Sequence, residues 1–207
     1  MIPHKTYFFL VHGLATSSKT LKPVEYLIKS KGFYNVYNIQ YNSTQLRLSD
    51  SIQSVHNNIL RIINKNDAKN SIIIGQSLGG VIAMNLHRKT GFKPRAVVSI
   101  ASPLQGCRFL KSLKGILPIS VQDHYYKPVY TDLMDMSDNI NQPPEHDYYT
   151  ISTSLPKMEF DGLIHTDETY YDISKHVFIR GHDHFTLFGS PLMLNVLSHK
   201  INEITKN

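Results

Sequence analysis

The chain has 207 residues, 41% of them hydrophobic, which fits one globular domain with a sizeable core. Its formal net charge of +6 reflects scarce acidic residues, and the basic residues are scattered rather than clustered with aromatic ones, which argues against a nucleic-acid-binding protein. The single cysteine excludes an intramolecular disulfide and a CxxC metal site.

The lengths of the apolar runs indicate whether the chain could span a membrane or carry a signal peptide. None approaches the roughly 18 residues needed to span a bilayer. The run at residues 7–11 has the length of a strand and is too short for the hydrophobic part of a signal peptide. We expect a soluble, by default cytoplasmic protein, with secretion by a leaderless route left open. The basic charge also allows transient contact with an anionic membrane surface.

Strand-like and helix-like segments alternate from the N-terminus onward. Residues 7–11 form an apolar run, and a helix-period segment over 19–30 ends before Gly32, which suits the left-handed turn after a helix. Period-two alternation predicts a second strand over 35–41. Apolar residues at helical spacing predict a second helix over 46–63.

The same alternation continues to the C-terminus. The remaining strands are predicted at 71–74, 96–100, 149–152 and 176–179, and the remaining helices at 78–84 and 191–204. This pattern predicts a single α/β domain over residues 1–207, with a mostly parallel central sheet and helices on both faces. Residues 104–147 lack a regular pattern, so we expect them to form a short cap or lid insertion at the C-terminal edge of the sheet.

The motif Gly75-Gln76-Ser77-Leu78-Gly79 matches the nucleophile elbow, G-x-S-x-G. It lies between a buried strand and an apolar helix. That context suits a tight turn that exposes the serine hydroxyl above the sheet, and the glycines leave room where strand and helix backbones approach. Ser77 is therefore the candidate nucleophile, although the motif also fits a glycine-rich turn with an incidental serine.

Acyl transfer needs backbone N–H donors aimed at the developing oxyanion. The amide of Leu78, directly after the candidate nucleophile, is one candidate. The second is the amide of Leu14, in the His12-Gly13-Leu14 loop after the first strand. A strand that ends in glycine is common, so the His-Gly pair alone does not indicate an oxyanion hole. The assignment of Leu14 depends on the nucleophile elbow further along the chain.

A catalytic base is expected late in the chain, after the last strand. The segment Arg180–Phe185 contains two histidines, His182 and His184. We favour His184, because the residues after it lead directly into the final helix. His182 stays an alternative.

A buried carboxylate should orient the base. Asp161, in an Asp-Gly pair followed by apolar residues, precedes the base and gives the order Ser, Asp, His expected of this fold. Asp167 and Asp172 compete, but they fall in a segment predicted to be polar, exposed and helical. Asp161 could also be a plain turn residue.

At these residues the chain resembles the α/β-hydrolase superfamily, especially its compact serine lipases and esterases. The resemblance runs from Val11-His12-Gly13 through the elbow and Asp161-Gly162 to His184. It implies Asp161 as triad acid and His184 as base. Ser102-Pro103-Leu104-Gln105-Gly106-Cys107 is similar to the family's Ser/Thr-Pro-His-x-Gly segment, with Leu104 where a histidine is frequent.

These residues predict a serine hydrolase that cleaves carboxylic esters through an acyl-enzyme, without a cofactor or metal. Apolar residues of the expected cap could hold an acyl chain or merely close the core, so the substrate could be a lipid ester, a thioester or a small soluble ester. They are Leu113, Ile116, Leu117, Ile119, Val121, Tyr125, Tyr126, Tyr130, Leu133, Met134 and Met136. Alternatives are a thioesterase or deacylase using the same triad, a metal-dependent hydrolase using His182, Asp183 and His184, and a non-catalytic binding protein on this fold.

Overall fold

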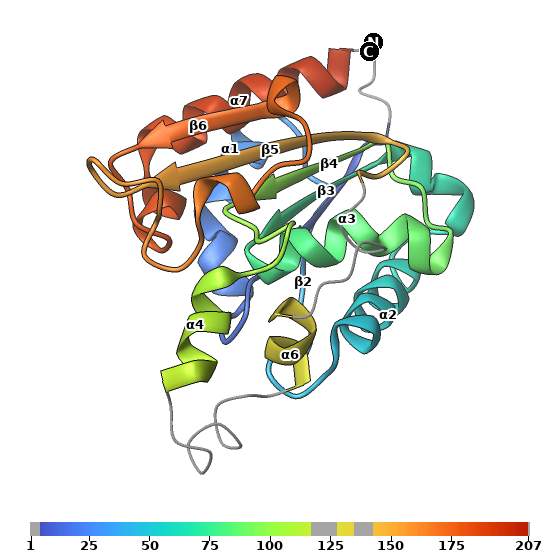
Figure 1. The fold of residues 1–207 in the computed structure, drawn as a ribbon. Coiled ribbons are helices and arrows are strands. Elements are labelled where there is room, and N and C mark those ends of the chain that lie inside the picture. Colours follow the sequence, from blue (N-terminus) through green and yellow to red (C-terminus); the bar gives the residue numbers. More distant parts are fainter. Residues whose placement is uncertain (1–4, 117–127, 135–142, 207) are drawn as a thin grey trace.

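The computed structural model describes residues 5–116, 128–134 and 143–206. Within these ranges, six strands form one sheet in the order β2-β1-β3-β4-β5-β6, and every neighbouring pair is parallel (Figure 1). The strands are β1 (Tyr7–Val11), β2 (Val36–Ile39), β3 (Ser71–Gln76), β4 (Ala96–Ile100), β5 (Asp147–Ser154) and β6 (His176–Arg180). The helices are α1 (Lys22–Ser30), α2 (Leu48–Leu60), α3 (Leu78–Thr90), α4 (Arg108–Ile116), α6 (Pro128–Met134) and α7 (Pro191–Lys206). The predicted α/β fold class is confirmed.

Helices cover both faces of the sheet because successive strand residues point to opposite sides. Phe9 and Ile73 face a core that α2, α3 and α6 close. Their neighbours Phe8 and Ile72 face the opposite core, which α1 and α7 close. The two groups of helices lie on opposite sides of the strands in Figure 1. A sheet buried on both faces explains the continuous apolar runs of its central strands.

The element boundaries differ from the prediction mainly at helix ends. The segment predicted as one helix over 19–30 is divided into a 3₁₀ helix, η1 (Ser18–Leu21), and α1. Helix α3 runs to Thr90, well beyond residue 84, and ends where Gly91 adopts a left-handed conformation with φ 69°. None of the helices within the described ranges is both long and apolar enough to cross a bilayer.

The segment predicted as a cap contains regular structure that its sequence pattern did not reveal. Helices α4 and α6 both lie within residues 104–147, and they pack against each other. Leu133 of α6 is buried. Most of the other apolar residues named for the expected cap lie outside the described part of the chain. Six lie outside it altogether: Leu117, Ile119, Val121, Tyr125, Tyr126 and Met136. For four more the side chain alone is not described: Leu113, Ile116, Tyr130 and Met134. That the segment forms a cap remains a prediction.

Candidate active site

Ser77 occupies the turn between β3 and α3 in a conformation that non-glycine residues rarely adopt. Its φ is 51° and its ψ is −121°. Such a conformation costs on the order of 1–3 kcal/mol and persists where the surroundings enforce it. The Ser77 N–H donates a hydrogen bond to the carbonyl of Ile100 in the neighbouring strand, at 2.9 Å. The sheet thus holds the serine in the strained turn.

The glycines of the elbow are required by close backbone contacts. A Cβ on Gly75 would lie 2.4 Å from the carbonyl oxygen of Gly79, and a Cβ on Gly79 would lie 2.1 Å from the carbonyl oxygen of Val11. A Cβ on Gly80 would lie 2.0 Å from Oγ of Ser102. Real Cβ atoms essentially never come this close to another heavy atom. Gly75 and Gly79 therefore allow helix α3 to approach β3 and β1, and Gly80 leaves room for the side chains of Ser99 and Ser102.

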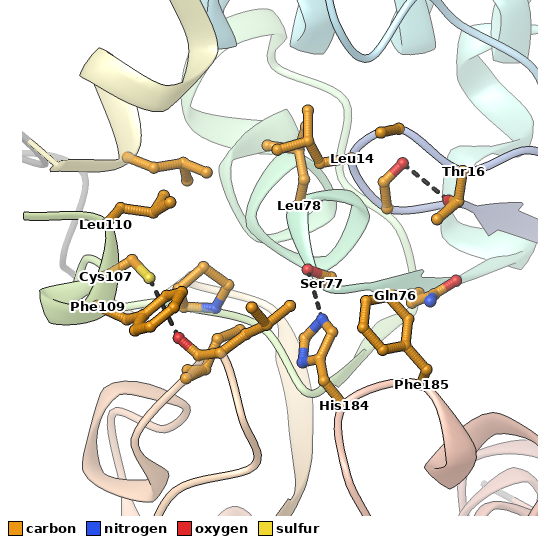
Figure 2. Close-up of a pocket in the computed structure, with 16 residues that line it drawn as sticks. Leu14, Thr16, Gln76, Ser77, Leu78, Cys107, Phe109, Leu110, His184 and Phe185 are labelled. Atoms are coloured by element: carbon orange, nitrogen blue, oxygen red, sulfur yellow. Dashed lines mark hydrogen bonds between the residues drawn. The ribbon is translucent and has the colours of Figure 1, made fainter. Parts of the chain in front are cut away.

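The structure brings Ser77, His184 and Asp161 together. The Oγ of Ser77 lies 3.1 Å from Nε2 of His184, and Nδ1 of His184 lies 2.8 Å from Oδ2 of Asp161. Figure 2 shows the His184 ring turned toward Ser77. Because a carboxylate only accepts hydrogen bonds, Nδ1 is the donor to Asp161, and Nε2 is then free to accept from the serine hydroxyl. In this arrangement Nε2 of His184 is placed to take the serine proton.

Asp161 is fixed by the loop that carries it. Its side chain is 1% exposed. Its second oxygen, Oδ1, accepts from the backbone N–H groups of Leu163 (2.9 Å) and Ile164 (2.7 Å). Each carboxylate oxygen thus has its own partners, which permits burial of the charge. The Asp-Gly turn expected from the sequence is also the turn that orients this carboxylate.

The residues considered as alternatives to His184 and Asp161 form hydrogen bonds or ion pairs with other groups. Nε2 of His182 lies 3.0 Å from Oγ of Ser190, and the His182 carbonyl accepts from Thr153. Asp167 pairs with Arg108 at the surface, and Asp172 accepts from the N–H of Ser174. None of these three candidates lines the cavity at Ser77.

The prediction that the segment around Asp167 and Asp172 is helical and exposed was wrong in part. Only the short 3₁₀ helices η3 (Thr166–Glu168) and η4 (Ile173–Lys175) form there. Glu168 and Thr169 are buried. The polar composition was misleading because the Glu168 carboxylate accepts hydrogen bonds from two backbone N–H groups, one of the nearby His165 and one of Arg108, 60 residues away.

The segment His182-Asp183-His184 does not converge on a common point. His182 and His184 have different partners, as described, and Oδ1 of Asp183 accepts from the backbone N–H groups of Phe185 and Thr186. These hydrogen bonds hold the pKa of Asp183 below its usual value. Over the part of the chain that the structure describes, no group of three His, Cys, Asp or Glu residues is placed to hold a metal ion.

The predicted oxyanion donors border the same space. Leu78 is the first residue of α3, so its N–H lies at the positive end of the helix dipole. Leu14 lies in the loop after β1, beside Gly13, where an added Cβ would lie 3.1 Å from Cβ of Ser77. His12 itself is fully buried and stacks on Tyr41, with ring centroids 4.6 Å apart. The role of the two leucine amides remains a prediction.

A cavity of about 500 Å³ opens beside Ser77, and its lining is mainly apolar. Figure 2 shows Cys107, Phe109 and Leu110 on one side of Ser77, and Thr16, Gln76 and Phe185 on the other. Leu133, Leu163 and Ile164 also line it. This volume is within the range of small-molecule sites.

Gln76 and Cys107 line the cavity but were given no role from the sequence. Gln76 is buried, and its Oε1 has no hydrogen-bond partner among the described residues. Burial raises the pKa of the Cys107 thiol to about 11, so this cysteine is a poor nucleophile at neutral pH. Leu104, where the resembling family often has histidine, is buried in the core and does not line the cavity. Only the position of Gln76 within the elbow motif could have drawn attention to it.

Residues 8–155 match the profile of a family described as "Uncharacterised protein family (UPF0227)". This range includes Ser77 but ends before Asp161 and His184. The sequence matches no curated protein.

Solved structures resemble this chain over nearly its whole length. The mature lipase BlEst2 of Bacillus licheniformis has a TM-score of 0.74 and 15% identity, covering 96% of this chain and 92% of the lipase. A monoacylglycerol lipase of Paleococcus ferrophilus has a TM-score of 0.69 and 13% identity, covering 99% and 95%. A carboxylesterase structure from Nitrososphaera gargenis has a TM-score of 0.64 and 14% identity, covering 99% and 92%. The chain therefore has the α/β-hydrolase fold.

Proposed function

The chain belongs to the uncharacterised protein family UPF0227, and from its α/β-hydrolase fold and site geometry we propose that it is a serine hydrolase that cleaves carboxylic esters. The observation that carries the proposal is the pair of hydrogen bonds that links Asp161 to His184 and His184 to Ser77, next to an apolar cavity. The named activities of the structural neighbours, lipase and carboxylesterase, agree with it.

The first step is attack by Ser77. Nε2 of His184 takes the hydroxyl proton as the Ser77 oxygen adds to the ester carbonyl carbon. The imidazolium that forms is stabilised by the Asp161 carboxylate, 2.8 Å from Nδ1. The N–H groups of Leu78 and Leu14 donate hydrogen bonds to the former carbonyl oxygen and so stabilise its negative charge.

The second half of the reaction reverses these roles. His184 returns the proton to the leaving alcohol as the ester C–O bond breaks, which leaves the acyl group on Ser77. A water molecule then loses a proton to His184 and adds to the acyl carbon. The bond from that carbon to the Ser77 oxygen breaks, His184 returns the proton to Ser77, and the acid is released. No step requires a metal or a cofactor.

The substrate is an ester with an apolar acyl group. The cavity beside Ser77 is bordered by Cys107, Phe109 and Leu110, with no charged side chain of Asp, Glu, Lys or Arg among the described lining residues. A thioester of the same acyl group would fit the same mechanism. Comparing turnover of an oxoester and a thioester with one acyl group distinguishes an esterase from a thioesterase.

A fluorophosphonate probe tests the proposal directly, because it reacts with an activated serine. The wild-type protein should be labelled on Ser77 and should hydrolyse a short-chain nitrophenyl ester. Ser77→Ala should lose both properties while its melting temperature stays close to that of the wild type. Labelling of the Ala variant at another serine would contradict the proposal.

A further inference from the structure

Glu168 is a buried carboxylate that joins two segments on the cavity side of the sheet. Its side chain is 6% exposed. Oε1 accepts from the backbone N–H of Arg108 (2.7 Å) and from Nε of the same residue (3.1 Å), and Oε2 accepts from the N–H of His165 (3.0 Å). The Glu168 carbonyl also accepts from the N–H of Gln105, at 3.0 Å. Both oxygens and the main chain of Glu168 are therefore engaged.

These contacts fix the beginning of α4. Arg108 is the first residue of that helix, whose first N–H groups have no partner within it. A carboxylate at this end satisfies a free N–H and interacts favourably with the helix dipole. Asp167 also pairs with the Arg108 side chain, but the Asp167 side chain is 63% exposed, so water screens that pair. The buried Glu168 is the stronger anchor.

Helix α4 carries one wall of the cavity. Phe109 and Leu110 follow Arg108 directly and line the cavity with Cys107, on one side of Ser77 (Figure 2). The thiol of Cys107 donates to the carbonyl of Leu163, another lining residue, at 3.5 Å. We call Cys107, Phe109, Leu110 and Leu163 the apolar wall. Glu168 anchors the helix from which two of its members project.

We propose that Glu168 is a positioning residue that sets the preference of the site for esters with longer apolar acyl chains. The inference rests on the proposed function, since it assumes that Ser77 forms an acyl-enzyme. A long acyl chain gains its binding energy from contact with the apolar wall. An acetyl group presents only one methyl group for such contact. Displacement of α4 therefore weakens recognition of the long chain and leaves the chemistry at Ser77 in place.

The chain offers a matched pair of variants. Glu168→Gln removes the charge of the buried anchor with almost no change of shape. Asp167→Asn makes the same kind of change at the neighbouring carboxylate, which pairs with the same arginine at the surface. Both remove one negative charge near Arg108, so a general electrostatic effect would appear in both.

The experiment measures kcat and KM for a nitrophenyl octanoate and a nitrophenyl acetate, with melting temperatures recorded. Wild type should prefer the octanoate. In Glu168→Gln, kcat/KM for the octanoate should fall about tenfold, mainly through KM, while the value for the acetate stays within about twofold. Asp167→Asn should stay within about twofold for both esters.

The outcomes separate this inference from the proposed function. Equal losses on both esters, or a wild type without preference for the octanoate, overturn the role of Glu168 while Ser77-dependent hydrolysis stands. If the wild type cleaves neither ester, or cleavage survives Ser77→Ala, the proposed function fails and this inference fails with it. Should Glu168→Gln not fold, Arg108→Ala keeps the backbone contact, removes the side-chain pair and should shift the ester preference in the same direction.

Discussion

Asp161 and His184 are joined twice, once through their side chains and once through their backbones. Nδ1 of His184 lies 2.8 Å from Oδ2 of Asp161, and the His184 N–H donates to the Asp161 carbonyl at 2.8 Å. The orientation of the imidazole thus depends on two separate loops that are tied to each other. Because the backbone link does not involve the carboxylate, side-chain variants at Asp161 can be compared without loss of that link.

We expect Asp161→Asn to lower kcat by on the order of a thousandfold or more, with little change in substrate binding. The asparagine oxygen can still accept from Leu163 and Ile164, which places its NH₂ group toward Nδ1. The imidazole must then carry its proton on Nε2 and cannot accept one from Ser77. Steady-state kinetics on a short-chain ester measures the effect. Asp172→Asn, at an exposed turn, is the control, and near-normal turnover of the Asp161 variant would move the acid elsewhere.

The two histidines of the 180–185 segment should differ sharply. His184→Ala should lower turnover by several orders of magnitude, because an unassisted serine hydroxyl is a poor nucleophile at neutral pH. His182→Ala and Ser190→Ala each remove the hydrogen bond between His182 and Ser190, which is 3.0 Å long, and should lower turnover far less. Turnover of all three variants on one ester decides the matter. A large loss at His182 with near-normal His184→Ala would overturn the assignment of the base.

A methyl group at Gly79 should destabilise the fold strongly. Gly79→Ala would place Cβ against the backbone of Val11 in β1, where neither strand nor helix can yield without loss of packing. We expect the free energy of unfolding to fall by roughly 1–3 kcal/mol or more, measured by denaturant titration. Gly189→Ala, where a Cβ meets nothing within 4 Å, is the matched control. Equal stability of the two variants would show that helix α3 does not need its close approach to β1.

The stability of the protein should fall as pH is lowered from 6.5 toward 4. Burial, and then the nearby His87 and Lys93, lower the pKa of His146 to about 4 from an ordinary value of 6.5, against a smaller opposite effect of Asp147. Between these values the unfolded chain binds the proton and the folded chain does not, so falling pH favours unfolding.

His146→Phe should reduce that pH dependence, because phenylalanine keeps an aromatic ring against His87 and binds no proton. His176, whose pKa burial also lowers to about 4, would account for part of the remaining slope. Melting temperatures at several pH values between 4 and 7 measure the effect, with His199→Gln on the exposed side of α7 as control. An unchanged slope in His146→Phe would contradict the assignment.

Ester hydrolysis should survive strong chelation. The proposed stabilisation of the oxyanion comes from the backbone amides of Leu14 and Leu78, which no chelator removes. Activity measured before and after dialysis against EDTA should agree. A loss that added zinc or manganese reverses would favour the metal-dependent alternative at His182, Asp183 and His184.

The sequence alone was sufficient to predict the alternating strands and helices and the parallel sheet. These follow from hydrophobic periodicity, which local side-chain pattern determines. The elbow could also be located in advance, because the close backbone contacts at Gly75 and Gly79 tolerate few other residues.

The tertiary structure decided the relationships between distant segments. The loops after β5 and β6 fold over the end of β3. Their arrangement decides which histidine forms a hydrogen bond with Ser77 and which carboxylate forms one with that histidine. The anchoring of α4 by Glu168, 60 residues away, likewise has no local signal. Glu168 appeared exposed by composition and is buried in the fold. Periodicity reports which face of an element is apolar, whereas the partners of a buried polar group are set only when the chain is packed.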